Sequence, residues 1–338
     1  NNNMFNHRQF YDMVQLFCHL LSCTRLDRLI NYLPDDLNSS TSNDFNKLGD
    51  IRNYCSNGGS GETECKTDLD RINAGCLWLF EQAVIINFDN LSNDESKRFI
   101  IYIMVWLNNM LNLKKDEQIK NLNDFYTKYI ENNKDYNNCQ KKIKDNNYND
   151  CSDTLNEKTG YKSFKEFIEK NGYLMNINIM SKFYDAFKSL CKMYTEVDAD
   201  DPKSKKNLEN AEKFVEKYKE LNDNSSISGD SSYSQIFSNL STDYNNFKDY
   251  CNVNNVDCND IPDLSSIKTT KPRVQSSEDH SEQVSDVTPS SSSITNKLII
   301  VLSIFSAIPI FLGISYKYSL FGFRKRGQKQ HLREKLKK

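Results

Sequence analysis

An uncharged apolar segment near the C-terminus constrains this 338-residue chain more than any other feature. It runs from Leu298 to Tyr316, reads LIIVLSIFSAIPIFLGISY and is bracketed by Lys297 and Lys317. At about 1.5 Å of rise per residue, a helix of this length spans roughly 28 Å, which is close to the thickness of the hydrocarbon core of a bilayer. We therefore predict one transmembrane helix at residues 298–316, with the lipid bilayer as a partner.

The tail after this segment, residues 317–338, sets the expected orientation. It contains nine of the 44 Lys and Arg residues of the chain but one of the 46 Asp and Glu residues. Because short basic loops stay on the cytosolic side of a membrane, we predict a cytosolic tail and an ectodomain that faces the outside or a lumen. The rest of the chain then holds 35 basic and 45 acidic residues. This acidic balance argues against nucleic acid as a partner, because nucleic-acid binding requires a basic surface.

Changes in composition divide the chain before the membrane segment. Residues 265–297 are rich in Ser and Thr and contain no aromatic residue, which predicts a disordered stalk. Residues 23–264 are long enough to bury a sizeable core and are predicted to form the ectodomain. Residues 1–22 are an atypical N-terminal extension, and whether they belong to the mature protein stays open. The apolar run at 13–23 lacks a small-x-small cleavage site, so a signal peptide is disfavoured. A first amphipathic helix, or upstream sequence of little structural importance, is favoured instead.

The ectodomain is predicted to be mainly α-helical, because its apolar residues recur at steps of three and four and no long run alternates. Thr67 or Asp68 is expected to cap one helix, and Gly75 within it predicts close packing against a neighbour. The segment at 99–113 is apolar nearly all round, which is typical of a fully buried central helix. The predicted helices cover residues 24–37, 68–88, 99–113, 116–134, 163–170, 174–194, 203–221 and 233–251.

Polar segments rich in Asn and Ser separate these helices at residues 38–66, 132–160 and 222–232. We expect them to be long exposed loops whose sequence can change without affecting the core. Four Asn-x-Ser sequons indicate accessible loops at most; they begin at Asn38, Asn90, Asn224 and Asn239.

All ten cysteines precede the membrane segment, on the side that is predicted to be oxidising. The even number fits a set of disulfides, although the pairing cannot be read from the sequence. Cys76 and Cys191 lie on apolar helix faces, and for them a buried thiol is the alternative. Three pairs each flank a loop and are local disulfide candidates: Cys55–Cys65, Cys139–Cys151 and Cys251–Cys258.

Little in the sequence predicts catalysis or cofactor binding. Of the four histidines, His19 alone can belong to the folded domain, which leaves little room for a catalytic triad. There is no G-x-S-x-G, HExxH, phosphate-loop or dinucleotide-binding motif. No CxxC pair exists, so a zinc site is disfavoured. We predict a non-enzymatic protein without cofactors or metals.

Specific segments in a fixed order carry a family resemblance. They include INYLPDDL (30–37), DRINAGCLWLF (70–80), YIMVWLNNMLNLK (102–114), MSKFYDAFKSLCKMYTE (180–196) and YKYSLFGFRKR (316–326). In these segments the chain resembles the Plasmodium interspersed repeat (PIR) family of variant surface proteins, over roughly residues 24–338. The family usually has only a few residues before its first cysteine, which Cys23 matches, so residues 1–22 depart from the pattern.

The resemblance implies a helical ectodomain on a single anchor, exported or exposed at the surface of malaria-infected cells, without enzymatic activity. The implied function is antigenic variation and immune evasion, with antibodies as partners. No RxLx[EQD] export motif is present, so any export is of the motif-negative kind. Two further functions stay open: an adhesin or ligand for a host cell-surface receptor, and a scaffold in an intracellular parasite membrane.

Overall fold

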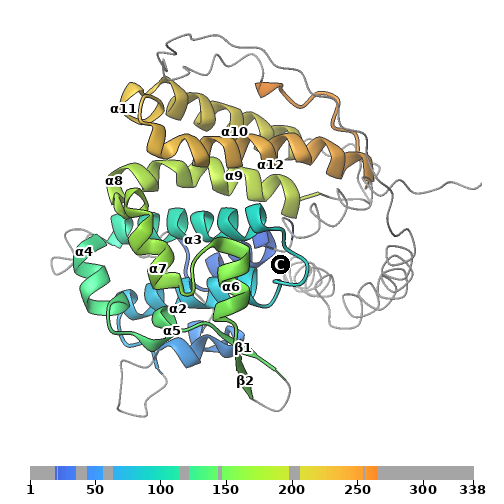
Figure 1. The fold of residues 1–338 in the computed structure, drawn as a ribbon. Coiled ribbons are helices and arrows are strands. Elements are labelled where there is room, and N and C mark those ends of the chain that lie inside the picture. Colours follow the sequence, from blue (N-terminus) through green and yellow to red (C-terminus); the bar gives the residue numbers. More distant parts are fainter. Residues whose placement is uncertain are drawn as a thin grey trace, which may run out of the picture. The chain divides into compact units, whose positions relative to one another are not determined.

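Helix α3 (Asn93–Lys114) lies at the centre of the structure, which is a computed structural model (Figure 1). Phe99–Leu107, the predicted central segment, is buried at every position, and Trp106 is fully buried. Asp94 and Glu95 lie in the first turn of α3 and Lys114 in its last turn, where each charge stabilises the helix dipole. The predicted buried helix is therefore present.

The structure describes residues 20, 22–35, 44–55, 64–114, 122–143, 147–197, 206–253 and 256–264, which belong to one compact unit. Within these residues no helix has the length and apolar character that crossing a membrane requires. The predicted stalk, transmembrane helix and basic tail lie outside them, as does most of the segment 1–22.

The ectodomain is mainly α-helical, as predicted. Residues 22–30 are helical. Eleven further α-helices in the described part of the chain are α2 (Asp68–Phe80), α3, α4 (Leu122–Phe125), α5 (Lys134–Asn137), α6 (Ser152–Thr159), α7 (Phe164–Lys170), α8 (Ile177–Met180), α9 (Tyr184–Thr195), α10 (Lys206–Asp223), α11 (Ser225–Ser228) and α12 (Ser234–Val253).

Shorter elements connect these helices. Two are π-helical, η3 (Glu81–Ile85) and η4 (Tyr126–Ile130). The strands β1 (Gln140–Lys142) and β2 (Tyr148–Asp150) form an antiparallel hairpin. The 3₁₀ turns are η1 (Phe45–Lys47), η2 (Gly49–Tyr54), η6 (Gly172–Met175), η7 (Ser181–Phe183) and η8 (Ser231–Tyr233).

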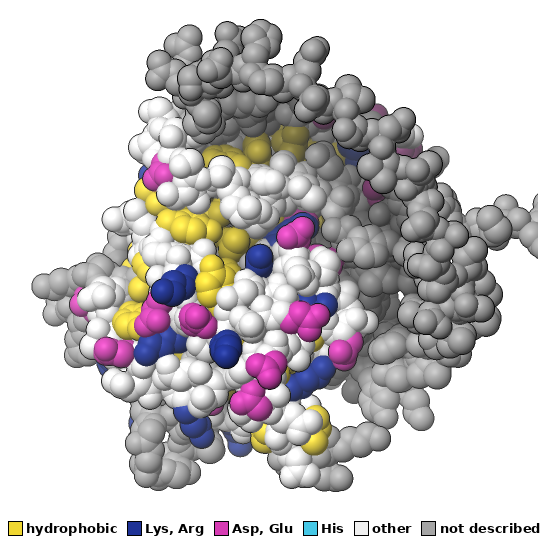
Figure 2. Space-filling model, in the orientation of Figure 1, with side chains coloured by type: hydrophobic (Ala, Val, Ile, Leu, Met, Phe, Trp, Pro, Cys, Tyr) yellow, Lys and Arg dark blue, Asp and Glu magenta, His cyan; other side chains and the backbone are white. Residues whose placement is uncertain are grey.

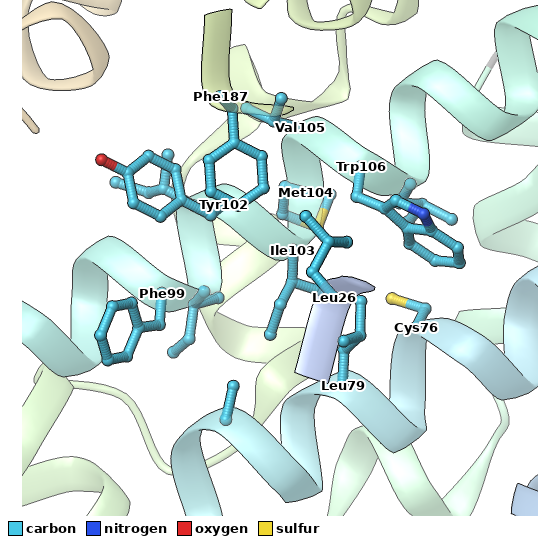
Figure 3. Close-up of a cluster of buried hydrophobic side chains, with 14 of the residues drawn as sticks. Leu26, Cys76, Leu79, Phe99, Tyr102, Ile103, Met104, Val105, Trp106 and Phe187 are labelled. Atoms are coloured by element: carbon cyan, nitrogen blue, oxygen red, sulfur yellow. The ribbon is translucent and has the colours of Figure 1, made fainter. Parts of the chain in front are cut away.

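The helices pack in successive layers around α3. Helix α2 packs against one side of α3, and α9 packs between α3 and the outer pair α10 and α12 (Figure 1). Apolar side chains from α2, α3, α9 and the helix at residues 22–30 meet in one cluster, which includes Leu26, Leu79, Tyr102 and Phe187 (Figure 3). A cavity of about 20 Å³ remains there, so the core is close-packed.

Helix α2 begins with the predicted cap. The Thr67 hydroxyl accepts a hydrogen bond from the Asp70 backbone N–H at 3.1 Å, and the Asp70 carboxylate accepts one from the Thr67 N–H at 2.9 Å. This reciprocal capping box satisfies two backbone donors at the helix start. The Tyr129 hydroxyl also donates to Asp70 at 3.0 Å, so the cap fixes η4 against α2.

Gly75 in α2 lies where the helix approaches two neighbours, as predicted. A Cβ atom at this position would lie 2.9 Å from the Trp106 ring and 3.3 Å from the Leu29 side chain. Both neighbours are fully buried, so neither can move away easily.

We therefore expect Gly75→Ala to lower the free energy of unfolding by about 1–3 kcal/mol, although alanine favours the helical backbone by up to about 1 kcal/mol. Urea denaturation of the purified chain measures this. Gly172→Ala is the control, because nothing lies within 4 Å of its added Cβ, and it should change stability by less than about 0.5 kcal/mol. A stabilised Gly75→Ala variant would contradict the close contact.

Three predicted helices differ from those in the structure. The helix predicted at 24–37 ends at residue 30, and residues 31–35 are not helical. The segment 174–194 is divided into η6, α8, η7 and α9, because the Asn176 side chain accepts a hydrogen bond from the Ile179 N–H and caps a new helix. In consequence Ile179 is only partly buried, whereas Met180 is buried. In the segment 116–134, residues 116–121 lie outside the described part of the chain. The described part is α-helical at Leu122–Phe125 and π-helical at Tyr126–Ile130.

The prediction of three long exposed loops was wrong in part. Single apolar side chains within each segment reach the core, among them Ile51, Tyr136, Leu155 and Ile227. These residues lie in short helices that are separated by polar positions, so no periodic signal reveals them. Many substitutions in these segments would therefore disturb the core.

Candidate functional surface

Four disulfides cross-link the described residues of the ectodomain. Cys55–Cys65, Cys139–Cys151 and Cys251–Cys258 are the three local pairs named from the sequence. The fourth joins Cys23 to Cys191 across a sequence separation of 168. The alternative of a buried thiol was therefore wrong for Cys191. No local signal could have found its partner, because the two cysteines belong to distant helices.

Cys76 is the one cysteine of the described residues without a disulfide, and it is fully buried in α2. Burial raises the pKa of its thiol to about 12, although a hydrogen bond with Tyr136 opposes the shift. Because the thiolate is the reactive form of cysteine, this side chain is inert at neutral pH. For Cys76 the structure supports the predicted buried thiol.

The hairpin β1–β2 is an exposed element that a disulfide holds at its base. The Cys139–Cys151 bond closes its base, where the Cys151 N–H donates to the Cys139 carbonyl at 3.0 Å. Lys141 forms an ion pair with Asp89 at 3.2 Å. Every side chain of β2 is exposed, and Tyr148 keeps 48% of its surface. The sequence did not predict this hairpin, because its strands are short and mostly polar.

A groove lies between the helix at residues 22–30 and α9. Its volume is about 280 Å³. Its apolar floor includes Leu26 and Ile30, and its charged lining residues are Asp27, Lys188, Lys192 and Glu196. The Cys23–Cys191 disulfide joins the two helices that form its walls. This groove was not found from the sequence, because its two sides are far apart along the chain.

The surface charges are mixed. On the face shown in Figure 2, acidic and basic side chains are interspersed, and neither gathers into one large patch. None of the four histidines lies within the described residues, and no group of three His, Cys, Asp or Glu side chains there could hold a metal ion.

The sequons differ in accessibility. Asn90 is exposed, whereas Asn224 uses its side chain to cap α11 by accepting from the Ser226 N–H at 3.2 Å. Asn239 keeps only 4% of its surface within α12, so the expectation of an accessible loop there was wrong. Asn38 lies outside the described residues.

Three fully buried tyrosines give the core a predictable pH dependence. Burial raises the pKa of Tyr102, Tyr136 and Tyr194 well above 10.0, and the Asp243 charge adds to the shift of Tyr102 and Tyr194. Above pH 10 the unfolded chain therefore releases protons that the native state retains, and stability falls as pH rises.

We expect the free energy of unfolding to fall by up to about 1.4 kcal/mol per pH unit for each of these tyrosines between pH 10 and pH 12. Urea denaturation across this range measures the slope. In the triple variant Tyr102→Phe/Tyr136→Phe/Tyr194→Phe, the free energy of unfolding should fall with pH clearly less steeply than in the unmodified protein. This holds whatever the absolute stability of the variant. An unchanged slope would contradict the assignment.

Comparison with known proteins gives a family match and a structural match. Residues 23–317 match the model of a family described as Plasmodium variant antigen protein Cir/Yir/Bir. A solved structure entitled "Structure of a Plasmodium PIR protein ectodomain" is 32% identical in sequence, with a TM-score of 0.55. That alignment covers 75% of this chain and 99% of the other. No curated protein matches the chain.

Proposed function

The chain belongs to the Plasmodium variant antigen family Cir/Yir/Bir, and on this premise we propose that it is a non-enzymatic surface antigen of infected cells that serves antigenic variation and immune evasion. In this proposal residues 298–316 anchor the chain in a membrane and residues 317–338 face the cytosol. The ectodomain is then exposed to host plasma and its antibodies.

The disulfide framework is the observation that carries this proposal. Eight of the nine cysteines in the described residues are in disulfide bonds. Disulfides persist outside the cytosol and are rare within it. The framework thus supports an ectodomain on the non-cytosolic side, and it argues against a protein whose cysteines are kept reduced.

Variation of such an antigen requires surface positions that the fold tolerates. The strand β2 is exposed along its whole length. The outward face of α10 is also exposed, whereas its inward face buries Phe214, Tyr218 and Leu221. Substitutions at exposed positions usually change stability by less than about 0.5 kcal/mol. Sequence change there would alter the antibody-facing surface while the core stays intact.

Antibody staining of infected cells tests the proposal. One antibody is raised against the disulfide-closed peptide of residues 139–151, and a second against the tail 317–338. We expect the first to stain intact cells and the second to stain only permeabilised cells. Protease treatment of intact cells should remove the first signal. Staining of the hairpin only after permeabilisation would refute surface display.

A second candidate function, a ligand for a host receptor, is favoured by the apolar side chains of the hairpin. Ile143 and Tyr148 keep 43% and 48% of their surface exposed, and exposed tyrosines are frequent anchors in protein interfaces. A screen of the full chain in nanodiscs against host cell-surface receptors tests this function. Binding should be saturable and lost in Ile143→Ser/Tyr148→Ser, whereas Leu113→Ser, which alters a side chain of equal exposure to Ile143, should leave it unchanged.

A further inference from the structure

The groove between the helix at residues 22–30 and α9 contains two charges of opposite sign that the fold leaves unused. Within the described part of the chain, neither the Asp27 carboxylate nor the Lys192 ammonium makes a hydrogen bond or ion pair. Both line the same groove of about 280 Å³. The two charges interact across the groove, because Lys192 lowers the pKa of the Asp27 carboxyl group, but they do not meet in a direct contact.

The other charged side chains of the groove are already held. Lys188 is bound to Asp35, which also accepts a hydrogen bond from the Tyr184 hydroxyl at 2.7 Å. Glu196 accepts a hydrogen bond from the Asn210 side chain at 3.0 Å. These contacts fix the direction of two rim side chains, and they leave Asp27 and Lys192 free to bind a ligand.

Asp27 is in an environment that favours a cationic neighbour. Partial burial and the nearby Glu196 charge raise the pKa of its carboxyl group, whereas Lys192 and Lys188 lower it, and its side chain still reaches solvent. An ammonium group between Asp27 and Glu196 would relieve the repulsion of the two carboxylates. Such charge-assisted hydrogen bonds are roughly twice as strong as neutral ones.

The floor and the walls of the groove restrict the middle of the ligand. Leu26 and Ile30 contribute apolar surface to the same groove. The Cys23–Cys191 disulfide ties the two helices together, so the site is preformed and binding does not require the walls to be ordered. The volume lies near the lower end of small-molecule pockets, about 300–1,000 Å³, and suits a ligand with few heavy atoms.

We propose that this groove binds a small zwitterion with an apolar middle. The ammonium of the ligand lies against Asp27 and Glu196, its carboxylate is bound by Lys192, and its carbon chain packs on Leu26 and Ile30. The chemical class is the ω-amino acids, in which a carbon chain separates the two charges. The site does not depend on which membrane displays the protein, so its test is independent of the surface-antigen proposal.

Isothermal titration calorimetry on the full chain in detergent tests the site with defined probes. 4-Aminobutanoate and 6-aminohexanoate present the two charges at a short and a long separation, and at least one of them should bind saturably. Hexylamine and hexanoate each lack one charge and should bind at least about tenfold more weakly, because one charge-assisted contact is lost.

Variants distinguish this groove from other sites. Asp27→Asn and Lys192→Gln should each weaken binding of the zwitterion by about tenfold or more, since each removes one of the two charges. Asp185→Asn and Lys182→Gln are matched controls, because both side chains are exposed on the same layer but do not line the groove. These two variants should bind the zwitterion with unchanged affinity. The proposal is overturned if neither zwitterion binds, if hexylamine or hexanoate binds equally well, or if Asp27→Asn and Lys192→Gln have no effect.

Discussion

Replacing both Cys23 and Cys191 by alanine is expected to lower the free energy of unfolding by about 4–5 kcal/mol. Their disulfide closes a loop with a sequence separation of 168, and the chain-entropy model gives the largest stabilisation to the longest loop. A loss of this size approaches the whole stability of a marginal domain, about 5–15 kcal/mol. Urea denaturation followed by circular dichroism measures the change.

The variant Cys251→Ala/Cys258→Ala provides the matched control. It removes one disulfide by the same chemistry, but the sequence separation is 7, so the expected loss is only about 2–3 kcal/mol. A loss in the Cys23/Cys191 variant that does not exceed the loss in this control would contradict the loop-closure argument. In that case contacts of the helix at residues 22–30, such as those of Leu29, would be sufficient to fix it.

The same disulfide illustrates where sequence reasoning stops. The pairs Cys55–Cys65 and Cys139–Cys151 flank short segments, so proximity along the chain suggests them. Cys23 and Cys191 come together only because α9 packs near the first helix. A contact of this kind depends on the tertiary arrangement, and a single sequence does not contain it in readable form.

Helices α2 and α3 could be predicted because local and tertiary preferences agree in them. Thr67 caps α2, as the sequence suggests, within a capping box completed by Asp70, and Gly75 lies at a close contact. The segment around α8 and α9 could not, because its apolar period continues through a break that the Asn176 side chain creates. A periodic pattern detects a buried face but does not detect a short-range cap that restarts the helix.

The candidate groove could not be predicted from the sequence for the same reason as the fourth disulfide: its two sides are far apart along the chain. Asp27 and Lys192 are two of many charged residues, and in a chain with 46 acidic and 44 basic residues a single pair has no weight. The structure selects them by three properties together: they line one cavity, they oppose each other in sign, and they lack partners among the described residues. The opposite signs follow from the sequence, but tertiary structure is required to establish the shared cavity and the lack of direct partners.

A buried ion pair between α3 and α12 gives the second large effect. The Arg98 guanidinium and the Tyr102 hydroxyl both donate to the Asp243 carboxylate, and the Tyr194 hydroxyl donates to the Asp243 carbonyl at 2.7 Å. The side chains of Arg98 and Asp243 keep 9% and 1% of their surface exposed. The pair therefore fixes the outer helix α12 to the central helix, with α9 joined through Tyr194.

We expect Asp243→Asn to lower the free energy of unfolding by about 3–5 kcal/mol, because it leaves the Arg98 charge buried without a counter-ion. The double variant Arg98→Met/Asp243→Leu should regain part of this loss, since it removes both buried charges. The surface pair Lys141–Asp89 is the control: Asp89 is 84% exposed, so Asp89→Asn should cost less than about 1 kcal/mol. Equal losses for Asp243→Asn and Asp89→Asn would show that the buried pair does not hold α12. If the double variant is no more stable than Asp243→Asn, removing the unpaired Arg98 charge brings no gain. The loss in Asp243→Asn would then come from altered packing and not from the buried charge.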